Sequence, residues 1–224
     1  MPWYACQLDE ASESCMRPEG RVPQTELAKA ANTKMYQIGL QFHGFRCRVI
    51  DEETFNEAVA IAGNKSNALG EWSLGLLEQC VAWIQRNTDD EGQIHVEGCC
   101  DRQGGRKRYA PMLNAAFQQW NPWFEILEED AACSRYRGAF GDLDLHVRFQ
   151  VQGDSLLPAA SASMLAKWIR ERLMLRLNRY WRERVGNDLK PTAGYPVDAE
   201  RFRRAIAKAI DPSLHATHRW WRCC

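Results

Sequence analysis

Two acidic residues stand where the strands of an α/β sheet commonly place a functional side chain. Asp101 closes the apolar run GQIHVEGCCD, which we interpret as a central strand, and Asp154 lies in a Gly-Asp-Ser turn before a long helix. The carboxyl ends of strands in an open α/β sheet meet at one edge, so we expect both carboxylates to converge there. Carboxylate oxygens are the ligands that Mg²⁺ and Mn²⁺ prefer, and such ions activate water for phosphodiester hydrolysis. Turn formation and helix capping are the plain structural alternatives.

Basic residues follow each of the two acids. Those after Asp101 surround a Gly-Gly pair in the turn RQGGRKRY, and those after Asp154 lie on the helix that the Gly-Asp-Ser turn begins. The first group is Arg102, Arg106, Lys107 and Arg108, and the second is Lys167 and Arg170. Guanidinium and ammonium groups bind phosphate oxygens well, above all beside a helix N-terminus, so both groups are candidate nucleic-acid contacts. The alternative is a solvated basic surface without a ligand.

Hydrophobic periodicity predicts an α/β arrangement that would carry these residues. We expect strands where apolar residues alternate or run together, the last of them half-buried at a sheet edge. Helices are expected where apolar residues recur at spacings of three and four, with Asp51 and Asp198 as caps of two of them. The expected strands are 36–50 (one strand or a hairpin), 92–101, 123–129, 133–137 and 143–151, and the expected helices are 54–62, 69–86, 108–120, 158–184 and 197–210.

Size and composition predict one folded domain. The chain has 224 residues, 45% of them hydrophobic and 26% charged, which suits a single sizeable core. Prolines and Gly20 interrupt the beginning, so residues 1–35 are expected to be an irregular segment and residues 36–224 the domain. The 29 Lys and Arg residues equal the 29 Asp and Glu residues, so any nucleic-acid binding must rest on a local basic patch.

Several common classes of protein lack support in the sequence. The chain has no Gly-x-Ser-x-Gly elbow, P-loop or dinucleotide fingerprint, and no run of about 18 apolar residues. Its nine cysteines form no Cys-x-x-Cys pair, and His215 and His218 beside Cys223 and Cys224 lack a zinc-ligand spacing. These features favour a reduced, cytoplasmic protein without a membrane partner, and we expect a monomer.

Three segments carry a resemblance to a known family. The segment QGDSLLPAASASMLAKWIRE, residues 152–171, resembles the motif of type 2 ribonuclease H (ribonuclease HII) in which an Asp in a Gly-Asp-Ser turn precedes a Ser/Ala-rich helix with Ala-Lys-x-x-Arg. Downstream, PTAGYPVDAERF is similar to the segment with which that family closes its core, and Tyr195 matches its motif tyrosine. Upstream, IHVEGCCDRQGGR resembles the strand that delivers the family's third acid. The similar stretches span roughly residues 45 to 210.

The resemblance implies a fold and an activity. The fold would be a ribonuclease H-like mixed sheet flanked by helices, and the activity a metal-dependent hydrolysis of the RNA strand of RNA–DNA hybrids. Asp101 and Asp154 would be the catalytic ligands of Mg²⁺ or Mn²⁺, and the basic residues named above would hold phosphates. Tyr195 would stack on a sugar. Glu171 matches the family's helix acid, although pairing with neighbouring arginines explains this residue equally well.

The chain departs from the family at its beginning. The family opens with a hydrophobic strand ending in Asp-Glu-Ala-Gly-x-Gly, which supplies two of four acids. Residues 9–11 read DEA, but PWYACQL before them is a poor strand and SES replaces the glycines after them. We therefore expect a sheet without its first strands, in an N-terminally shortened member of the family. A non-catalytic nucleic-acid-binding module is the main alternative, and a related acid-cluster nuclease with another substrate is a third.

Overall fold

The computed structural model describes residues 24–88, 92–121, 123–210 and 221–222. They separate into two compact units. The sheet unit comprises residues 46–168 and the described residues after 210, whereas the helical unit comprises residues 24–45 and 169–210.

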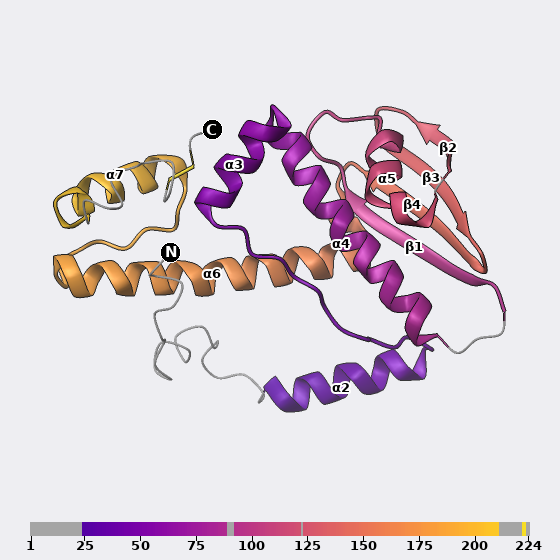
Figure 1. The fold of residues 1–224 in the computed structure, drawn as a ribbon. Helices are drawn as coiled ribbons and strands as arrows, with labels where there is room; N and C mark the ends of the chain where they lie inside the picture. Colours follow the sequence, from indigo (N-terminus) through magenta and orange to yellow (C-terminus); the bar gives the residue numbers. More distant parts are fainter. Residues whose placement is uncertain (1–23, 89–91, 122, 211–220, 223–224) are drawn as a thin grey trace. The chain divides into compact units, whose positions relative to one another are not determined.

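A four-stranded mixed sheet forms the centre of the sheet unit (Figure 1). The strands are β1 (Ile94–Asp101), β2 (Phe124–Glu129), β3 (Cys133–Phe140) and β4 (Leu143–Gln150). Their order across the sheet is β1-β4-β3-β2; β1 and β4 run parallel, while the other two pairs are antiparallel. Gly141, with a φ of +59°, occupies the first position of the two-residue loop between β3 and β4, where a type II′ hairpin needs glycine.

Local capping explains the helices of this unit. Asp51 precedes α3 (Glu52–Ala62), and its carboxylate accepts a hydrogen bond from the Thr54 N–H at 2.9 Å, which confirms the predicted cap. Gly63 ends α3 with a φ of +74°, and Asn64 begins α4 (Lys65–Asn87) by accepting from the Asn67 N–H at 2.8 Å. The short helix α5 (Ala110–Ala116) passes into a 3₁₀ turn at Gln118–Trp120 and so is shorter than expected.

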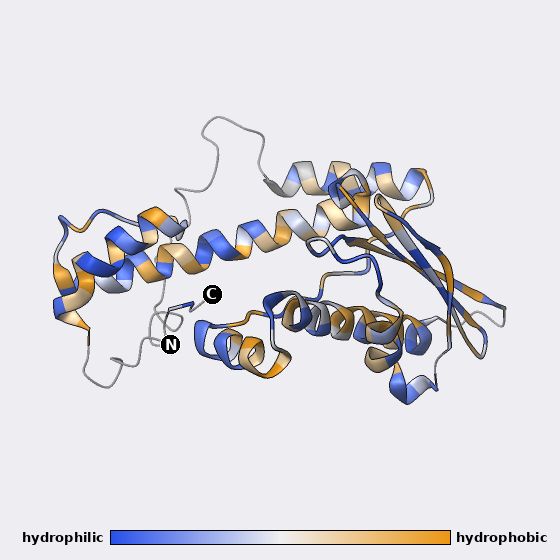
Figure 2. Ribbon diagram, turned by 90° about the horizontal axis from the view of Figure 1, so that it is seen from above, coloured by the Kyte–Doolittle hydropathy of each residue, from blue (hydrophilic) through white to orange (hydrophobic). Residues whose placement is uncertain are grey.

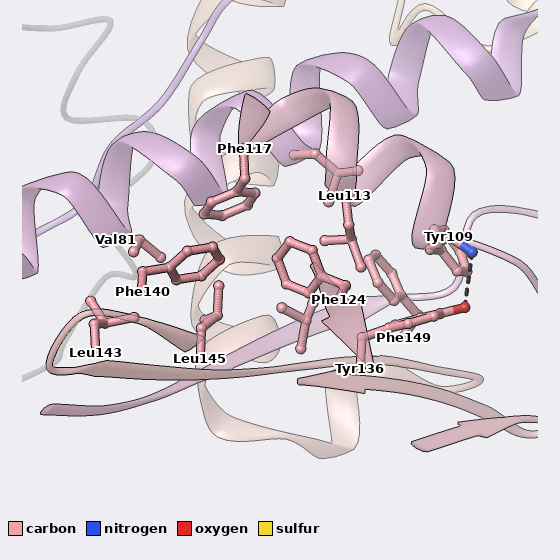
Figure 3. Close-up of a cluster of buried hydrophobic side chains, with 12 residues drawn as sticks. Val81, Tyr109, Leu113, Phe117, Phe124, Tyr136, Phe140, Leu143, Leu145 and Phe149 are labelled. Atoms are coloured by element: carbon pink, nitrogen blue, oxygen red, sulfur yellow. Dashed lines mark hydrogen bonds between the residues drawn. The ribbon is translucent and has the colours of Figure 1, made fainter. Parts of the chain in front are cut away.

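The core lies between the sheet and the pair α4 and α5 (Figure 3). The strands alternate hydrophobic and hydrophilic residues (Figure 2), so one face of the sheet is apolar. Tyr109 of the segment entering α5 stacks on Phe149 of β4 at 3.6 Å with nearly parallel rings. The buried cluster consists of Leu74, Val81, Tyr109, Leu113, Phe117, Phe124, Tyr136, Phe140, Leu143, Leu145, Val147 and Phe149. Burial of these twelve side chains holds the sheet and the two helices together.

The helical unit contains α2 (Gln24–Gln37), the part of α6 (Leu157–Val185) from Ile169 onward, and α7 (Pro196–Ile206) with a 3₁₀ turn at Ala207–Ala209. The loop between α6 and α7 is held by side-chain bonds to its backbone. Asn178 of α6 both donates to the Thr192 carbonyl and accepts from the Thr192 N–H, each at 2.8 Å. The Arg201 guanidinium donates to the carbonyls of Lys190 and Pro191 at 3.2 and 2.8 Å. These hydrogen bonds hold the loop in place, although it contains no helix or strand.

The beginning of the described chain differs from expectation. Residues 36–50 were predicted as a strand or hairpin, yet α2 runs to Gln37 and residues 38–50 form no strand; apolar side chains such as Ile38 and Phe42 are 72% and 53% exposed. Alternation is not enough to make a strand, because a strand also needs a neighbour that accepts its backbone hydrogen bonds. The predicted irregular segment 1–35 is helical from Gln24 onward, and residues 1–23 lie outside the described residues.

Two strand positions and one cap were also predicted wrongly. β4 was expected at an edge but is central, between β1 and β3, and its outward-facing Asp144 is therefore buried as well. β1 was expected to be central but is an edge strand, because the β2–β3–β4 meander lies on one side of it only. Asp198 does not cap α7, whose N-cap residue is Tyr195; its carboxylate instead accepts from the Thr192 hydroxyl and the Ala193 N–H.

Candidate functional site

The chain brings the segments of Asp101 and Asp154 together at the end of the parallel strand pair. Asp101 is the last residue of β1 and pairs in register with Gln150, the last residue of β4. Gln152, with a φ of +57°, turns the chain into a 3₁₀ turn at Gly153–Ser155. The Gly153 N–H donates to Asp101 Oδ1 at 3.0 Å, so Asp154, the next residue, begins its exposed side chain beside the same edge.

Glycine at position 153 is what permits this approach. A Cβ atom at that position would lie 2.7 Å from Asp101 Cα and 3.1 Å from Asp101 N, well inside the separation of about 3.5–4.0 Å that carbon atoms normally keep. The contact is with the backbone of β1, which cannot rotate away as a side chain could. Any larger residue at position 153 would therefore force either the Asp154 turn or the end of β1 to shift.

Two exposed carboxylates at one edge can share a cation, but they provide few ligands. In the ranges that the structure describes, no group of three or more His, Cys, Asp or Glu side chains has an arrangement that could hold a metal ion. Asp9 and Glu10, the sequence's imitation of the missing acidic motif, lie outside the described residues, as do His215 and His218. The described residues thus bring a turn that carries one acid to the end of a strand that carries another, without a third ligand.

Arg102 and Arg106 have structural partners. The Arg102 guanidinium donates to the carbonyls of Ala131 and Asp130 and to Ser134 Oγ, so it binds the turn between β2 and β3. The Arg106 guanidinium contacts Asn67 Oδ1 in the first turn of α4 and lies 5.9 Å from the centre of the Tyr109 ring. Both guanidinium groups bind protein atoms, so neither is positioned to contact a phosphate.

Lys107 and Arg108 are the members of this turn that face solvent. Lys107 is exposed, while its carbonyl accepts from Ser134 Oγ at 2.6 Å, which fixes the backbone and leaves the ammonium group outside. The Arg108 side chain is 87% exposed and approaches Glu129 only at 3.8 Å, too far for a normal hydrogen bond. Of the four predicted phosphate contacts near Asp101, these two have the geometry for it.

A buried hydrogen-bond network holds the same turn on the sheet. The hydroxyl of Tyr136, a fully buried residue of β3, accepts from the Tyr109 N–H at 2.9 Å and contacts a Glu129 carboxylate oxygen at 2.5 Å (Figure 3 shows the first bond). Burial and the Glu129 carboxylate together raise the pKa of Tyr136, so its hydroxyl keeps its proton and donates it to Glu129. The Tyr109 hydroxyl in turn accepts from the Gln103 N–H at 3.0 Å. Hydrogen bonds therefore fix the basic turn at both of its ends, Gln103 and Tyr109.

The second predicted group divides between the two units. Lys167 is exposed on α6 within the sheet unit. Arg170 and Tyr195 belong to the helical unit, where the Arg170 guanidinium lies 5.1 Å from the centre of the Tyr195 ring and donates to the Ala193 carbonyl. Tyr195 is 64% exposed, so the predicted stacking residue presents its ring to solvent beside a cation. The structure thus brings the turn of Asp154 to Asp101 and, separately, Arg170 to Tyr195.

One polar cluster went unnoticed in the sequence. Asp144 of β4 is only 4% exposed, and Arg137 of β3 donates to both of its oxygens at 2.7 and 3.3 Å. His95 Nδ1 and His146 Nε2 lie 3.4 and 3.5 Å from Asp144 Oδ2. The hydrogen bond from Arg137 lowers the pKa of Asp144, with help from His146. The i, i+2 spacing of Asp144 and His146 placed them on one face of a strand, but His95 and Arg137 join them only through strand register.

Comparison with protein-family models, with curated proteins and with solved structures finds no match to this chain. None of the helices in the described ranges is long and apolar enough to span a membrane.

Proposed function

We propose that this protein is a metal-dependent endonuclease of the type 2 ribonuclease H kind, which hydrolyses the RNA strand of RNA–DNA hybrids. The observation that carries the proposal is the bond from the Gly153 N–H to Asp101, which brings the turn of Asp154 to the end of β1. A second support is the α/β architecture, a mixed sheet with helices on it, in which the two acids follow parallel strands. A ribonuclease H-like fold is part of the proposal.

Asp101 and Asp154 would hold one Mg²⁺ or Mn²⁺ ion. Mg²⁺ is commonly bound by one or two carboxylates, with water and substrate phosphate oxygens as its other ligands, so the two side chains fit this role. A bound ion would supply charge stabilisation at the phosphate and lower the pKa of a coordinated water. A second ion would need more carboxylates than the described residues gather at this edge.

The remaining roles belong to the chain's basic and aromatic residues. Lys107 and Arg108 project from a turn that is bonded to Ser134 of β3, at the same end of the sheet as the end of β1 that carries Asp101. Each would contact a phosphate of the hybrid, which is the kind of contact that positions a substrate without reading its sequence. Tyr195, with Arg170 on its ring, would stack on a sugar. Lys167 is a further candidate phosphate contact.

A cleavage assay tests the proposal. The RNA strand of an RNA–DNA duplex carries a label, and cleavage is followed with Mg²⁺, with Mn²⁺ and with EDTA. Asp101→Asn and Asp154→Asn should each lose at least about a hundredfold of the rate, because a cation contributes several kcal/mol to the transition state. Asp142→Asn, which removes an exposed acid from the β3–β4 loop, is the matched control and should cleave normally. Equal rates for all four proteins, or rates indifferent to EDTA, would end the proposal.

A non-catalytic nucleic-acid-binding module is the second candidate. It is favoured by the fact that Asp101 Oδ1 already accepts a backbone hydrogen bond and that no third acid joins the pair in the described ranges. This candidate predicts that the wild-type protein binds the hybrid in EDTA and in Mg²⁺ alike without cutting it. Neutralising Arg108 should then reduce the salt dependence of binding by roughly 0.9 in log–log slope. Cleavage that is lost in Asp154→Asn would exclude it.

A further inference from the structure

The charge of the chain is strongly uneven, although its total is zero. Residues 169–210, the part of α6 in the helical unit together with α7 and the loop between them, contain eleven Lys and Arg but only five Asp and Glu. This stretch therefore carries a formal charge of +6, and the rest of the chain carries −6. A local excess of this size favours an anionic partner, and the balanced total conceals it.

The acidic side chains of α7 form hydrogen bonds and ion pairs within α7 and the loop before it. Asp198 accepts from the Thr192 hydroxyl, the Ala193 N–H and the Arg201 guanidinium, and these bonds lower its pKa to about 2. Glu200 is shared between Arg203 and Arg204, which lower its pKa to about 2 as well. One carboxylate facing two guanidinium groups leaves a net positive charge on that side of the helix. The acids thus organise the cations without cancelling them.

Three exposed cations, Lys190, Arg204 and Lys208, lie on the loop before α7, on α7 and in the turn after it. Arg201 donates to the Lys190 and Pro191 carbonyls, so the Lys190 backbone lies against α7 beside Arg201. Arg204 follows Arg201 by three residues on α7, a spacing that puts two side chains on one side of an α-helix, and Lys208 lies in the 3₁₀ turn that follows α7 directly. The Arg204 side chain is 77% exposed. Within the described residues, the ammonium groups of Lys190 and Lys208 have no ion-pair partner.

We propose that this basic row, consisting of Lys190, Arg204 and Lys208, binds the phosphate backbone of a nucleic acid. The proposal goes beyond the cleavage proposed above and shares with it only the class of ligand, because it involves neither a metal ion nor the acids at the end of β1. Three exposed cations on the loop, α7 and the turn after it suit a polymer that carries several phosphates. The exposed Tyr195 ring at the start of α7 adds an aromatic surface of the kind on which a base or sugar stacks.

An anionic membrane is the other surface that attracts such a row, and α7 is poorly built for it. An interfacial helix inserts an apolar face into the lipid while its cations contact the headgroups. The apolar residues Phe202 and Ile206 of α7 are 4% and 2% exposed, so they are already packed inside the helical unit. The charged side chains of α7 are therefore exposed while most of its apolar side chains are buried. This arrangement favours a nucleic-acid phosphate backbone over a membrane as the partner.

Salt-dependent binding tests the proposal with the full chain. Fluorescence anisotropy of a labelled RNA–DNA duplex is measured in EDTA, so that cleavage cannot occur, over a series of salt concentrations. The triple variant Lys190→Gln, Arg204→Gln, Lys208→Gln should reduce the slope of log K against log salt by roughly 3, since each lost phosphate contact contributes roughly 0.9. The matched control neutralises three exposed lysines elsewhere, Lys29→Gln, Lys34→Gln and Lys65→Gln, and should keep the wild-type slope. Circular dichroism verifies that both variants are folded.

The outcomes are separable from those of the cleavage assay. A slope change confined to the basic-row variant supports the proposal even if no metal ion ever yields cleavage. Equal losses in both variants would reduce the effect to overall charge and overturn the proposal, as would wild-type protein that does not bind the duplex. Binding to vesicles containing phosphatidylserine but not to the duplex, with the same dependence on the basic row, would assign the surface to membranes instead.

Discussion

The close approach of Gly153 to β1 allows a sharp test of how the acidic edge is built. In Gly153→Ala, the new methyl group would lie 2.7 Å from Asp101 Cα and 3.0 Å from Asp101 Cβ. Either the 3₁₀ turn or the end of β1 must shift, and the hydrogen bond from the Gly153 N–H to Asp101 Oδ1 is weakened or lost. Overpacking against backbone costs about 1–3 kcal/mol and the hydrogen bond about 1 kcal/mol, so the free energy of unfolding should fall by about 2–4 kcal/mol.

Urea denaturation of the wild type and two variants measures this effect. Gly105→Ala is the matched control, because a Cβ at Gly105 meets nothing within 4 Å and the φ angle of this residue is not positive. It should leave stability within about 0.5 kcal/mol or raise it slightly through the unfolded state. If Gly153→Ala were as stable as Gly105→Ala, the contact between the Asp154 turn and β1 would not be the tight one described above. The proposal that Asp101 and Asp154 share a cation would then lose its physical basis.

Two further predictions concern the polar groups of the sheet. Tyr136→Phe leaves the buried Tyr109 N–H without an acceptor and should lower the free energy of unfolding by about 1–3 kcal/mol in urea denaturation, whereas Tyr36→Phe, which alters a residue that is 72% exposed, should change it little; equal effects would contradict the role given to the network. Asp144→Asn should cost about 1 kcal/mol at neutral pH, because Arg137 is half-exposed. Since the folded-state pKa of Asp144 is lowered, its contribution is present above the unfolded value of about 3.9 and is lost as the pH falls through the folded value. The gap in stability between wild type and variant should therefore close as the pH is lowered below about 4. A gap that widens with acidification would show that Asp144 does not stabilise the fold as a carboxylate.

Elements whose order depends on neighbouring residues alone were predictable. Asp51 and Gly63 mark the ends of α3 because a cap needs only the residues beside it. Alternation located β4 for the same reason, since the side chains of a strand point to opposite faces whatever the partner. Position within the sheet was not predictable in this way. Which strand lies at an edge is decided by pairing between distant segments, and both β1 and β4 were therefore misplaced.

The candidate site shows the same limit. Asp101 and Asp154 could be selected because each stands at a turn after an apolar run. The role of Arg102 was hidden, because its partners Asp130, Ala131 and Ser134 are about thirty residues away and reach it only through the fold. The cluster around Asp144 was missed since its members come from three strands whose register the sequence does not show. Only contacts between distant segments distinguish the cations with structural partners from the exposed ones; their residue types do not.

The parallel pairing of β1 with β4 has a consequence for the order in which the protein assembles. β2, β3 and β4 are joined by short loops, so their pairing costs little loop-closure entropy. Ile94 of β1 pairs with Leu143 of β4 across a much longer stretch of chain, which contains α5, β2 and β3. We expect the meander to form early and β1 to dock late. The end of β1 and the turn of Asp154 would then meet only in the last stage of folding, and a molecule arrested before it would have most of its sheet without the acidic edge on which the proposed activity rests.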